Sequence, residues 1–396
     1  MPDPNTDVHG PLPTVRLKIQ RRSSHPWVFQ KMVEKPAGRI PPGSVVDVID
    51  RDGTWVGRGF YNGHSRISLR MLTARRDEAV DASFFSRRIN QAVQLRREWL
   101  RLDGVSDAYR LINSEGDGLS GLVVDRFADT LVLEFFAAGM FRCRDAIVAS
   151  LGQHFPGSRV HWFADEHVQK QESFDCHSPE PPPPAVITEH GVRFRVAPGS
   201  KHKTGFFLDQ RDNRHYLSTF CRDRRMLDLC CNSGGFAVYA KALGGASEVV
   251  GVDLDEQALA LARQNANLNR AQVRFVQADL FPWLREVTAN GQRFDVVVLD
   301  PAKQTRDREE IHYALKRYFD MNRLALQAVS PGGIFLTCSC TGLIAEADFL
   351  ESIRRAAYQA GRVLQVIRAS GAGADHPFMV HVPEGRYLKA IFCRVE

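Results

Sequence analysis

A regular alternation of strand-like and helix-like segments runs from about residue 205 to the C-terminus. The predicted strands lie at 226–231, 248–253, 273–276, 294–300 and 333–340, followed by two late runs, and the predicted helices at 236–243, 257–269, 313–328 and 347–361. Short connections between alternating strands and helices predict a doubly wound, mostly parallel α/β sheet. Ligands of such sheets bind at the carboxyl ends of the strands, so we expect the functional site there.

Two smaller regions precede this α/β pattern. Up to about Leu72, alternating apolar runs at 44–49, 54–61 and 67–72 are separated by turn residues, which predicts a small β barrel. An amphipathic helix begins near Asp81, and the mixed runs after it predict a small α+β region. Four consecutive prolines follow and favour a linker or a loop. We therefore expect three domains, at residues 1–75, 76–190 and 191–396.

The composition is typical of a globular enzyme whose cysteines are reduced. Of the 396 residues, 44% are hydrophobic and 25% charged, and no apolar run approaches the roughly 20 residues of a membrane helix. The N-terminus lacks the basic head and apolar stretch of a secretory signal. The eight cysteines form no Cys-X-X-Cys pair, so we expect neither a disulfide framework nor a metal site. These features predict a cytoplasmic protein with no membrane partner.

The positive charge is concentrated in the N-terminal quarter. Residues 1–100 contain 17 Lys and Arg against 10 Asp and Glu, a balance of +7, and the other 296 residues sum to −1. A basic module on a neutral body is an electrostatic footprint for a polyanion such as RNA. A modest surplus of surface Lys and Arg serves solubility equally well, so charge alone leaves both interpretations open.

A turn of small residues follows the first strand of the α/β region. It consists of Asn232, Ser233, Gly234 and Gly235. Such a turn lets a cofactor approach the N-terminus of the next helix, but it lacks the Gly-X-Gly-X-X-Gly spacing of a dinucleotide cradle. Asp228 lies in the first strand, Asp253 ends the second and Asp279 ends the third. Each aspartate alone is more typical of a helix cap. Together they favour a ribose and an adenine without phosphate, and therefore S-adenosyl-L-methionine rather than NAD.

Two further segments at strand ends contain reactive groups. Asp300-Pro-Ala-Lys303 places a carboxylate at the end of the fourth strand, although a proline there also simply ends a strand. Cys338 and Cys340 lie on the same face of the fifth strand. A thiol near a methyl donor can act as a covalent nucleophile, whereas free cysteines are more often apolar filling.

Several longer strings are distinctive. They are 24–29 (SHPWVF), 111–125, 203–211 (KTGFFLDQR), 232–236, 299–301, 339–342 and 375–377. On these strings the chain resembles the RlmI family of 23S rRNA cytosine-5 methyltransferases over nearly its whole length, from about Val15. The resemblance implies a PUA-like RNA-binding domain, a central α+β domain and a Rossmann-like class I methyltransferase domain. It also implies 23S rRNA as partner and leaves a homodimer open.

The resemblance assigns roles by position. The turn at 232–235, Asp253 and Asp279 would hold the methionine, ribose and adenine parts of S-adenosyl-L-methionine, and Gln210 and Arg211 would close over the cofactor. Cys340 would attack C6 of cytosine, Asp300 would hydrogen-bond the base, and Lys303 accompanies them in the catalytic set. Arg21 and Arg22 are expected to contact RNA phosphates. Cys338 is expected to pack.

One departure keeps alternatives open. Relatives carry Asp-Pro-Pro-Lys-Phe where this chain has Asp300-Pro-Ala-Lys-Gln304, so the wall for the target base differs. A base N-methyltransferase and a non-catalytic RNA-binding protein that retains the fold are the two alternatives.

Overall fold

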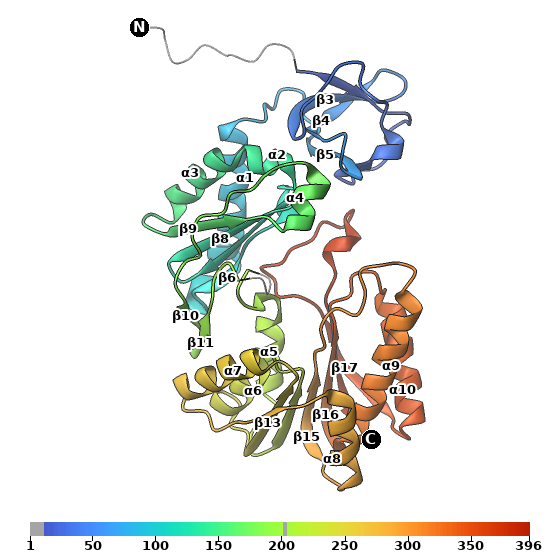
Figure 1. The fold of residues 1–396 in the computed structure, drawn as a ribbon. Helices are drawn as coiled ribbons and strands as arrows, with labels where there is room; N and C mark the ends of the chain where they lie inside the picture. The colour runs from blue at the N-terminus through green and yellow to red at the C-terminus, as the bar shows by residue number, and fades with distance from the viewer. Residues whose placement is uncertain (1–11, 201–203) are drawn as a thin grey trace.

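The structure is a computed structural model, and it describes residues 12–200 and 204–396. Figure 1 shows a small N-terminal sheet, a central region with its own sheet and helices, and a C-terminal layered α/β region. The three parts follow one another along the chain in the predicted order. The boundaries expected at 75/76 and 190/191 stay a prediction.

The N-terminal sheet is a curled half-barrel with the strand order β1-β3-β4-β5-β2. Its strands are β1 (Thr14–Arg16), β2 (Trp27–Phe29), β3 (Ser44–Ile49), β4 (Trp55–Tyr61) and β5 (Ile67–Thr73). Its two edges approach each other at a single antiparallel bridge between Leu17 and Val33. Alternate residues of β3 point into a small core that contains Val46 and Val48, as the alternating pattern predicts.

The central region pairs four strands in the order β6-β7-β8-β9 and covers them with helices. Its elements are α1 (Ala82–Gln94), a π-helical turn (Leu95–Trp99), β6 (Ala108–Asn113), β7 (Leu122–Phe127), β8 (Thr130–Phe135), α2 (Ala138–Arg142), α3 (Arg144–His154), β9 (Arg159–Phe163) and α4 (Glu166–Glu172). Asp81 caps α1 by accepting a hydrogen bond of 2.9 Å from the backbone N–H of Phe84. The pattern did not predict β6.

A short hairpin connects the central region to the C-terminal region. It consists of β10 (Ala185–Glu189) and β11 (Val192–Val196). The prolines before β10 have no regular structure, as expected of a linker or a loop, but the hairpin was not predicted. It packs against a helix of the next region through Phe194, which contacts Tyr239 in a stacked geometry.

The C-terminal region is a three-layer α/β sandwich. Its strands are β12 (Arg225–Leu229), β13 (Glu248–Asp253), β14 (Arg274–Gln277), β15 (Phe294–Leu299), β16 (Val329–Ser339), β17 (Leu364–Ser370) and β18 (Lys389–Val395). Its helices are α5 (Arg211–Ser218), α6 (Gly235–Ala242), α7 (Glu256–Leu268), α8 (Leu280–Ala289), α9 (Ile311–Gln327) and α10 (Glu346–Gln359). In Figure 1, α5, α6 and α7 cover one face of the sheet, and α8, α9 and α10 cover the other.

The seven strands have the order β14-β13-β12-β15-β16-β18-β17. All neighbouring pairs are parallel except those of β18, which inserts antiparallel between β16 and β17. The central strand β15 is buried on both faces, which explains its unbroken apolar run Val296–Leu299. The predicted doubly wound, mostly parallel sheet is confirmed, and β12 lies at the point where the strand order reverses.

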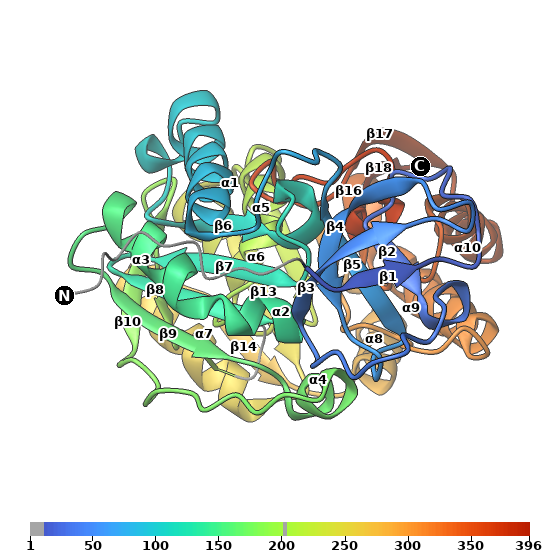
Figure 2. The same ribbon diagram turned by 90° about the horizontal axis from the view of Figure 1, so that it is seen from above.

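Polar contacts hold the three parts against one another. The buried carboxylate of Glu172 accepts hydrogen bonds from Asn62 (3.2 Å) and Ser65 (2.5 Å) of the N-terminal part. Arg96 of the central region donates to the backbone carbonyl of Asp375 at 2.7 Å. Seen from above in Figure 2, the N-terminal sheet overlies the half of the C-terminal sheet that contains β16, and the central region overlies α6 and α7. Both therefore lie over the same end of the large sheet's strands.

Candidate active site

A cavity of about 820 Å³ opens at the carboxyl ends of the parallel strands. Nine of the residues singled out from the sequence line it: Gln210, Asn232, Ser233, Gly235, Asp253, Asp279, Asp300, Lys303 and Cys340. They come from the loops after β12, β13, β14, β15 and β16 and from the segment before α5. The strand topology therefore brings residues that are up to 130 positions apart into one site, at the switch point where a doubly wound sheet binds ligands.

The turn after β12 has the backbone geometry of a cofactor loop. Asn232 and Gly234 have positive φ angles of 46° and 79°, and Gly234 is the N-cap of α6. A Cβ on Gly234 would lie 3.1 Å from the side chain of Ala262 and 3.2 Å from that of Phe275, so only glycine fits without displacing them. The backbone N–H of Asn232 donates to Oδ2 of Asp253 at 2.8 Å, which fixes the turn against the end of β13.

Asp228 supports this turn from below rather than lining the cavity. Its Oδ2 accepts a hydrogen bond of 2.9 Å from the backbone N–H of Ala237 in α6. Burial raises the pKa of the Asp228 carboxyl well above its usual value. Gly234 likewise shapes the turn without lining the cavity.

Asp279 serves both as a helix cap and as a cavity-lining residue, whereas Asp253 lines the cavity and the cap of α7 is Asp255. Asp279 is the N-cap of α8, where its Oδ1 accepts from the backbone N–H of Phe281 at 2.8 Å, and it also lines the cavity. Oδ1 of Asp253 accepts from the N–H of Asp255 at 3.0 Å. A carboxylate oxygen has two lone pairs, so each group can accept further hydrogen bonds from a ligand.

Gln210 reaches across the cavity to the end of β15. Its Nε2 donates to Oδ2 of Asp300 at 2.9 Å, and its Oε1 accepts from Nδ2 of Asn213 at 2.7 Å. Asn213 in turn accepts from the hydroxyl of Ser370 at 2.6 Å. This chain of hydrogen bonds fixes which end of the Gln210 amide faces Asp300.

Cys340 follows the last residue of β16 and is half-buried at the cavity wall. The adjoining Thr341 is held from two sides, because its Oγ1 accepts from the backbone N–H of Gln304 at 3.1 Å and lies 2.9 Å from the hydroxyl of Tyr318. The loop with Lys303 and the loop with Cys340 are thereby tied together. Cys338 packs in the apolar core between sheet and helices, as expected, and burial raises the pKa of its thiol well above the usual value.

Three other predicted residues lie outside the cavity wall. Arg211 is buried and makes a bidentate ion pair with Asp375, at 3.1 and 3.0 Å, so in this structure it ties α5 to the segment before β18. Arg22 is exposed on the N-terminal module, whereas Arg21 is half-buried and donates to the backbone carbonyl of His25 at 2.7 Å.

The structure also adds residues that the sequence analysis gave no role. They are Phe206, Phe207, Arg214, Phe281 and Tyr387. Phe206 and Phe207 lie inside the distinctive string 203–211, and Phe281 lies two positions after Asp279, so their positions carried a signal. Tyr387 carried none, because only the tertiary fold brings its hydroxyl to within 2.6 Å of Asp209.

The lining suits a nucleoside-like ligand with a sulfonium group. It combines carboxylates at the ends of β13 and β14, a glycine turn at a helix N-terminus and aromatic side chains. Within residues 12–200 and 204–396, no cluster of His, Cys, Asp and Glu could hold a metal ion. In the same ranges, no helix has the length and apolar character needed to cross a membrane.

Comparisons with known proteins agree with this geometry. Residues 145–372 match a family model described as S-adenosylmethionine-dependent methyltransferase, and residues 19–74 match one described as PUA-like domain. The crystal structure of the methyltransferase SMU.776 complexed with SAH superposes with a TM-score of 0.80 at 20% identity, covering 96% of this chain and 99% of that one. A SAM-dependent methyltransferase from Streptococcus mutans superposes with a TM-score of 0.78 at 18% identity, covering 97% and 100%.

Fold, cavity and family models together define the class: the chain is an S-adenosylmethionine-dependent methyltransferase with an N-terminal PUA-like domain. Two curated relatives narrow the assignment. The protein named ribosomal RNA large subunit methyltransferase I of Enterobacter sp. (strain 638) is 40% identical over 380 residues, 94% of this chain and 95% of that protein. Its namesake from Tolumonas auensis is 40% identical over 394 residues, 96% and 99%. The chain belongs to the ribosomal RNA large subunit methyltransferase I family.

The comparisons thus confirm the predicted methyltransferase fold, the PUA-like module and S-adenosyl-L-methionine as cofactor. The family match favours S-adenosyl-L-methionine over NAD, the weaker interpretation of the glycine turn.

Proposed function

We propose that this enzyme methylates carbon 5 of a cytosine in 23S rRNA. The observation that carries the proposal is that the thiol of Cys340, the carboxylate of Asp300 and the glycine turn of the methyl-donor site line one cavity. The names of the curated relatives supply the class of substrate, large-subunit ribosomal RNA. A ribosomal substrate would also place the enzyme in the cytoplasm.

The chemistry of cytosine explains why a thiol is needed. Carbon 5 is a weak nucleophile, and addition of the Cys340 sulfur to C6 makes it enamine-like by moving the π electrons of the C5–C6 bond toward C5. Bound S-adenosyl-L-methionine supplies the electrophilic methyl group. The enamine carbon C5 forms its bond to this methyl group, whose former bonding electrons stay on the donor sulfur. A base then removes the proton from C5, and the S–C6 bond breaks as the C5–C6 double bond re-forms, which releases Cys340 as a thiolate.

The surrounding side chains have defined tasks in this scheme. Asp300 would hydrogen-bond the cytosine. Gln210 holds the carboxylate in place by donating a hydrogen bond of 2.9 Å to Oδ2 of Asp300. Lys303 lies in the same wall, where its charge favours anionic groups. Asn232, Asp253 and Asp279 would hold the cofactor, and burial of the reacting groups would exclude water.

The target base has to leave its stack to enter the cavity. We propose that the PUA-like module grips the RNA backbone and that Arg21 and Arg22 contribute phosphate contacts. The module and the central region lie over the end of the large sheet where the cavity opens (Figure 2). An RNA strand held by the module would reach the cavity from there. The homodimer stays a prediction, which sedimentation of the purified protein checks.

The test uses purified protein, methyl-labelled S-adenosyl-L-methionine and undermodified large-subunit rRNA, with nucleoside analysis by mass spectrometry. We expect labelled 5-methylcytidine from the wild type, none from Cys340→Ala, and near wild-type yield from Cys338→Ala, the matched control that removes a packing thiol two positions away. Cofactor binding should persist in both variants.

Other outcomes would contradict the proposal in distinct ways. A nitrogen-methylated nucleoside would establish the base N-methyltransferase instead. RNA and cofactor binding without any methylated nucleoside would favour a binding protein and would point to Ala302 and Gln304 as the cause. Full transfer by Cys340→Ala would remove the covalent step alone.

A further inference from the structure

Lys389 is a buried cation directly behind the Cys340 loop. Its side chain is nearly inaccessible, with 2% of the residue surface exposed. Its ammonium donates three hydrogen bonds, to the backbone carbonyls of Thr341 (2.7 Å), Tyr387 (2.9 Å) and Ile344 (3.0 Å). An ammonium has three protons, so every donor is used.

The strand register explains why these three bonds act on Cys340. Lys389 is the first residue of β18 and pairs with Ser339, the residue immediately before Cys340. Two of the accepting carbonyls belong to the turn immediately after Cys340, at Thr341 and Ile344. The ammonium therefore closes this turn onto β18 and fixes the position of the thiol at the cavity wall.

The charge of Lys389 is not neutralised by an ion pair. No carboxylate lies within 4.0 Å of its ammonium in the residues that the structure describes, and the nearby Glu346 pairs instead with Arg386 at 2.7 Å. A buried charge without a counter-ion is costly, and carbonyl dipoles compensate it only in part. A buried ammonium of this kind can stabilise a neighbouring group that becomes negatively charged during the reaction.

The charged and titratable surroundings of Cys340 come from several elements. Cys338 lies on β16, Tyr318 on α9, and Asp300 and Lys303 follow β15. Burial lowers the pKa of Lys389 to about 8, while Cys340 and Glu346 act in the opposite direction and Arg386 and Lys303 reinforce the lowering. At pH 7 the ammonium is still the major form, and it attracts a thiolate at Cys340.

We propose that Lys389 is a positioning residue that holds the Cys340 loop and stabilises the thiolate form of Cys340. When the thiol loses its proton to solvent, the ammonium balances the new charge, so more of the nucleophile is in its reactive form. This inference deepens the proposed function, on which its catalytic meaning rests. The effect of Lys389 on the ionisation of the Cys340 thiol can be measured without RNA or cofactor.

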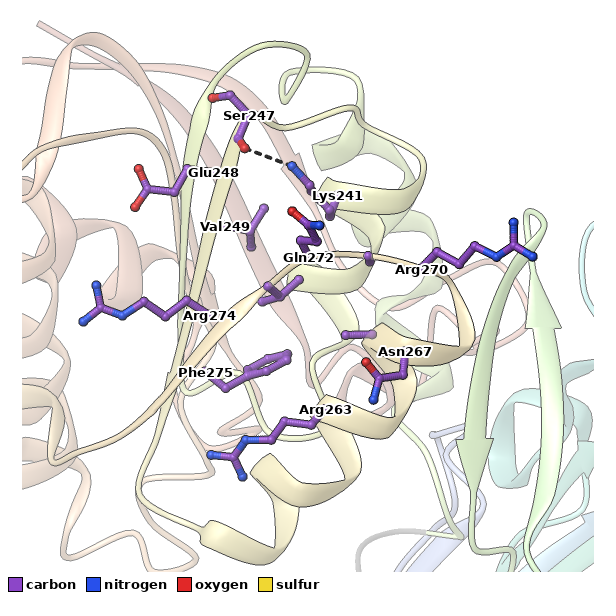
Figure 3. Close-up of a pocket in the computed structure, with 13 residues that line it drawn as sticks. Lys241, Ser247, Glu248, Val249, Arg263, Asn267, Arg270, Gln272, Arg274 and Phe275 are labelled. Carbon is purple, nitrogen blue, oxygen red and sulfur yellow. Dashed lines mark hydrogen bonds between the residues drawn. The ribbon is translucent and has the colours of Figure 1, made fainter.

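Lys241 provides a matched control. Its ammonium also binds backbone carbonyls, those of Ala246 (2.7 Å) and Ser247 (2.9 Å). Figure 3 shows it in a separate cavity beside the starting residues of β13 and β14. Lys241 thus closes a turn by the same chemistry at the opposite end of the sheet from Cys340.

The experiment measures alkylation of the full-length protein by iodoacetamide between pH 6 and 10. Modification of Cys340 is followed by peptide mass spectrometry in the wild type, Lys389→Met, Lys389→Gln, Lys389→Arg and Lys241→Met. Cys230 lines the same cavity, and burial raises the pKa of its thiol, so it is the internal reference within each sample. Melting temperature and SAH affinity establish that each variant is folded.

We expect the two neutral variants to move the inflection of the Cys340 profile upward by about one pH unit, with roughly tenfold slower alkylation at pH 7. Lys389→Arg retains the charge and should keep the inflection near its wild-type value, as should Lys241→Met. An unchanged inflection in both neutral variants would overturn the inference. So would a rate change of equal size at every pH, because that is the signature of altered access rather than of charge.

The two proposals fail separately. If Cys340→Ala still transfers methyl groups while Lys389→Met shifts the alkylation profile, the covalent mechanism is wrong and the electrostatic role stands. If Cys340→Ala is inactive and the profile does not move, Lys389 is excluded and the nucleophile stands.

Discussion

The side-chain amide of Gln210 donates a hydrogen bond of 2.9 Å to Oδ2 of Asp300, although 90 positions separate the two residues in the chain. The bond links the segment before α5 to the end of β15. It orients the carboxylate that we propose to hold the target base. The residues that place Asp300 are therefore found outside its own strand.

Replacing Gln210 by alanine should lower methyl transfer more than it lowers cofactor affinity. The lost bond is to a carboxylate, worth about 1.5–3 kcal/mol, so we expect a fall of about tenfold to a hundredfold in kcat/KM for RNA. Steady-state kinetics and SAH calorimetry measure the two effects. Gln359→Ala, at the exposed end of α10, is the control. Equal losses of transfer and of SAH affinity would show that Gln210 acts through the cofactor.

Replacing Gly234 by alanine should weaken cofactor binding. The added Cβ would meet Ala262 and Phe275 at 3.1 and 3.2 Å, and the residue has a φ of 79°, which costs non-glycine residues about 1–3 kcal/mol. Gly245→Ala is the matched control, since its φ is 68° and its Cβ would meet no atom within 4 Å. SAH calorimetry should show a loss for the first variant only, and denaturation should show a cost for both.

The sequence could place the strand-end residues of the candidate site near one another because the signals for them are local. Apolar runs buried on both faces identify parallel strands, and the residues at their carboxyl ends necessarily meet at one edge of the sheet. This places Asp253, Asp279, Asp300 and Cys340 together. The hairpin β10–β11 and the lining residue Tyr387 could not be predicted, because their positions depend on packing against elements far away in the chain.

Arg211 illustrates the limit of assigning roles by position. The resemblance implies that it closes over the cofactor, whereas in the structure its guanidinium makes a buried bidentate pair with Asp375, 164 positions away. Replacement by methionine removes the bidentate partner of this buried carboxylate, and we expect a loss of about 3–5 kcal/mol in the free energy of unfolding. Denaturant unfolding measures it. Arg354→Met, which breaks an exposed pair with Glu351, should cause no measurable change. A stable Arg211→Met that has lost SAH affinity would instead support the cofactor role.

The same ion pair predicts how stability depends on pH. Burial by itself would raise the pKa of the Asp375 carboxyl, but the charges of His376 and Arg211 beside it lower that pKa well below its usual value. A carboxyl with a depressed folded-state pKa stabilises the fold above its unfolded value of about 3.9, and this contribution is lost as the pH falls below it. Urea unfolding between pH 7 and pH 3 should therefore show a steeper acid loss for the wild type than for Asp375→Asn. Parallel curves would show that other carboxylates control acid unfolding.

The exposed Arg22 should contribute to RNA affinity through phosphate contact alone. Arg22→Ala should weaken binding of rRNA fragments to a similar degree whatever their sequence, and it should reduce the slope of log affinity against log salt by about one unit, because one fewer counter-ion is released. Binding titrations between about 50 and 200 mM salt measure the slope, because counter-ion release changes the affinity strongly in this range. Arg354→Ala, on α10 at the far end of the chain, is the charge-matched control and should leave the slope unchanged. SAH affinity should not change in either variant, since neither residue lines the cofactor cavity. A slope equal to that of the wild type would remove Arg22 from the RNA interface, and a loss confined to one sequence would mean that Arg22 reads a base instead of a phosphate.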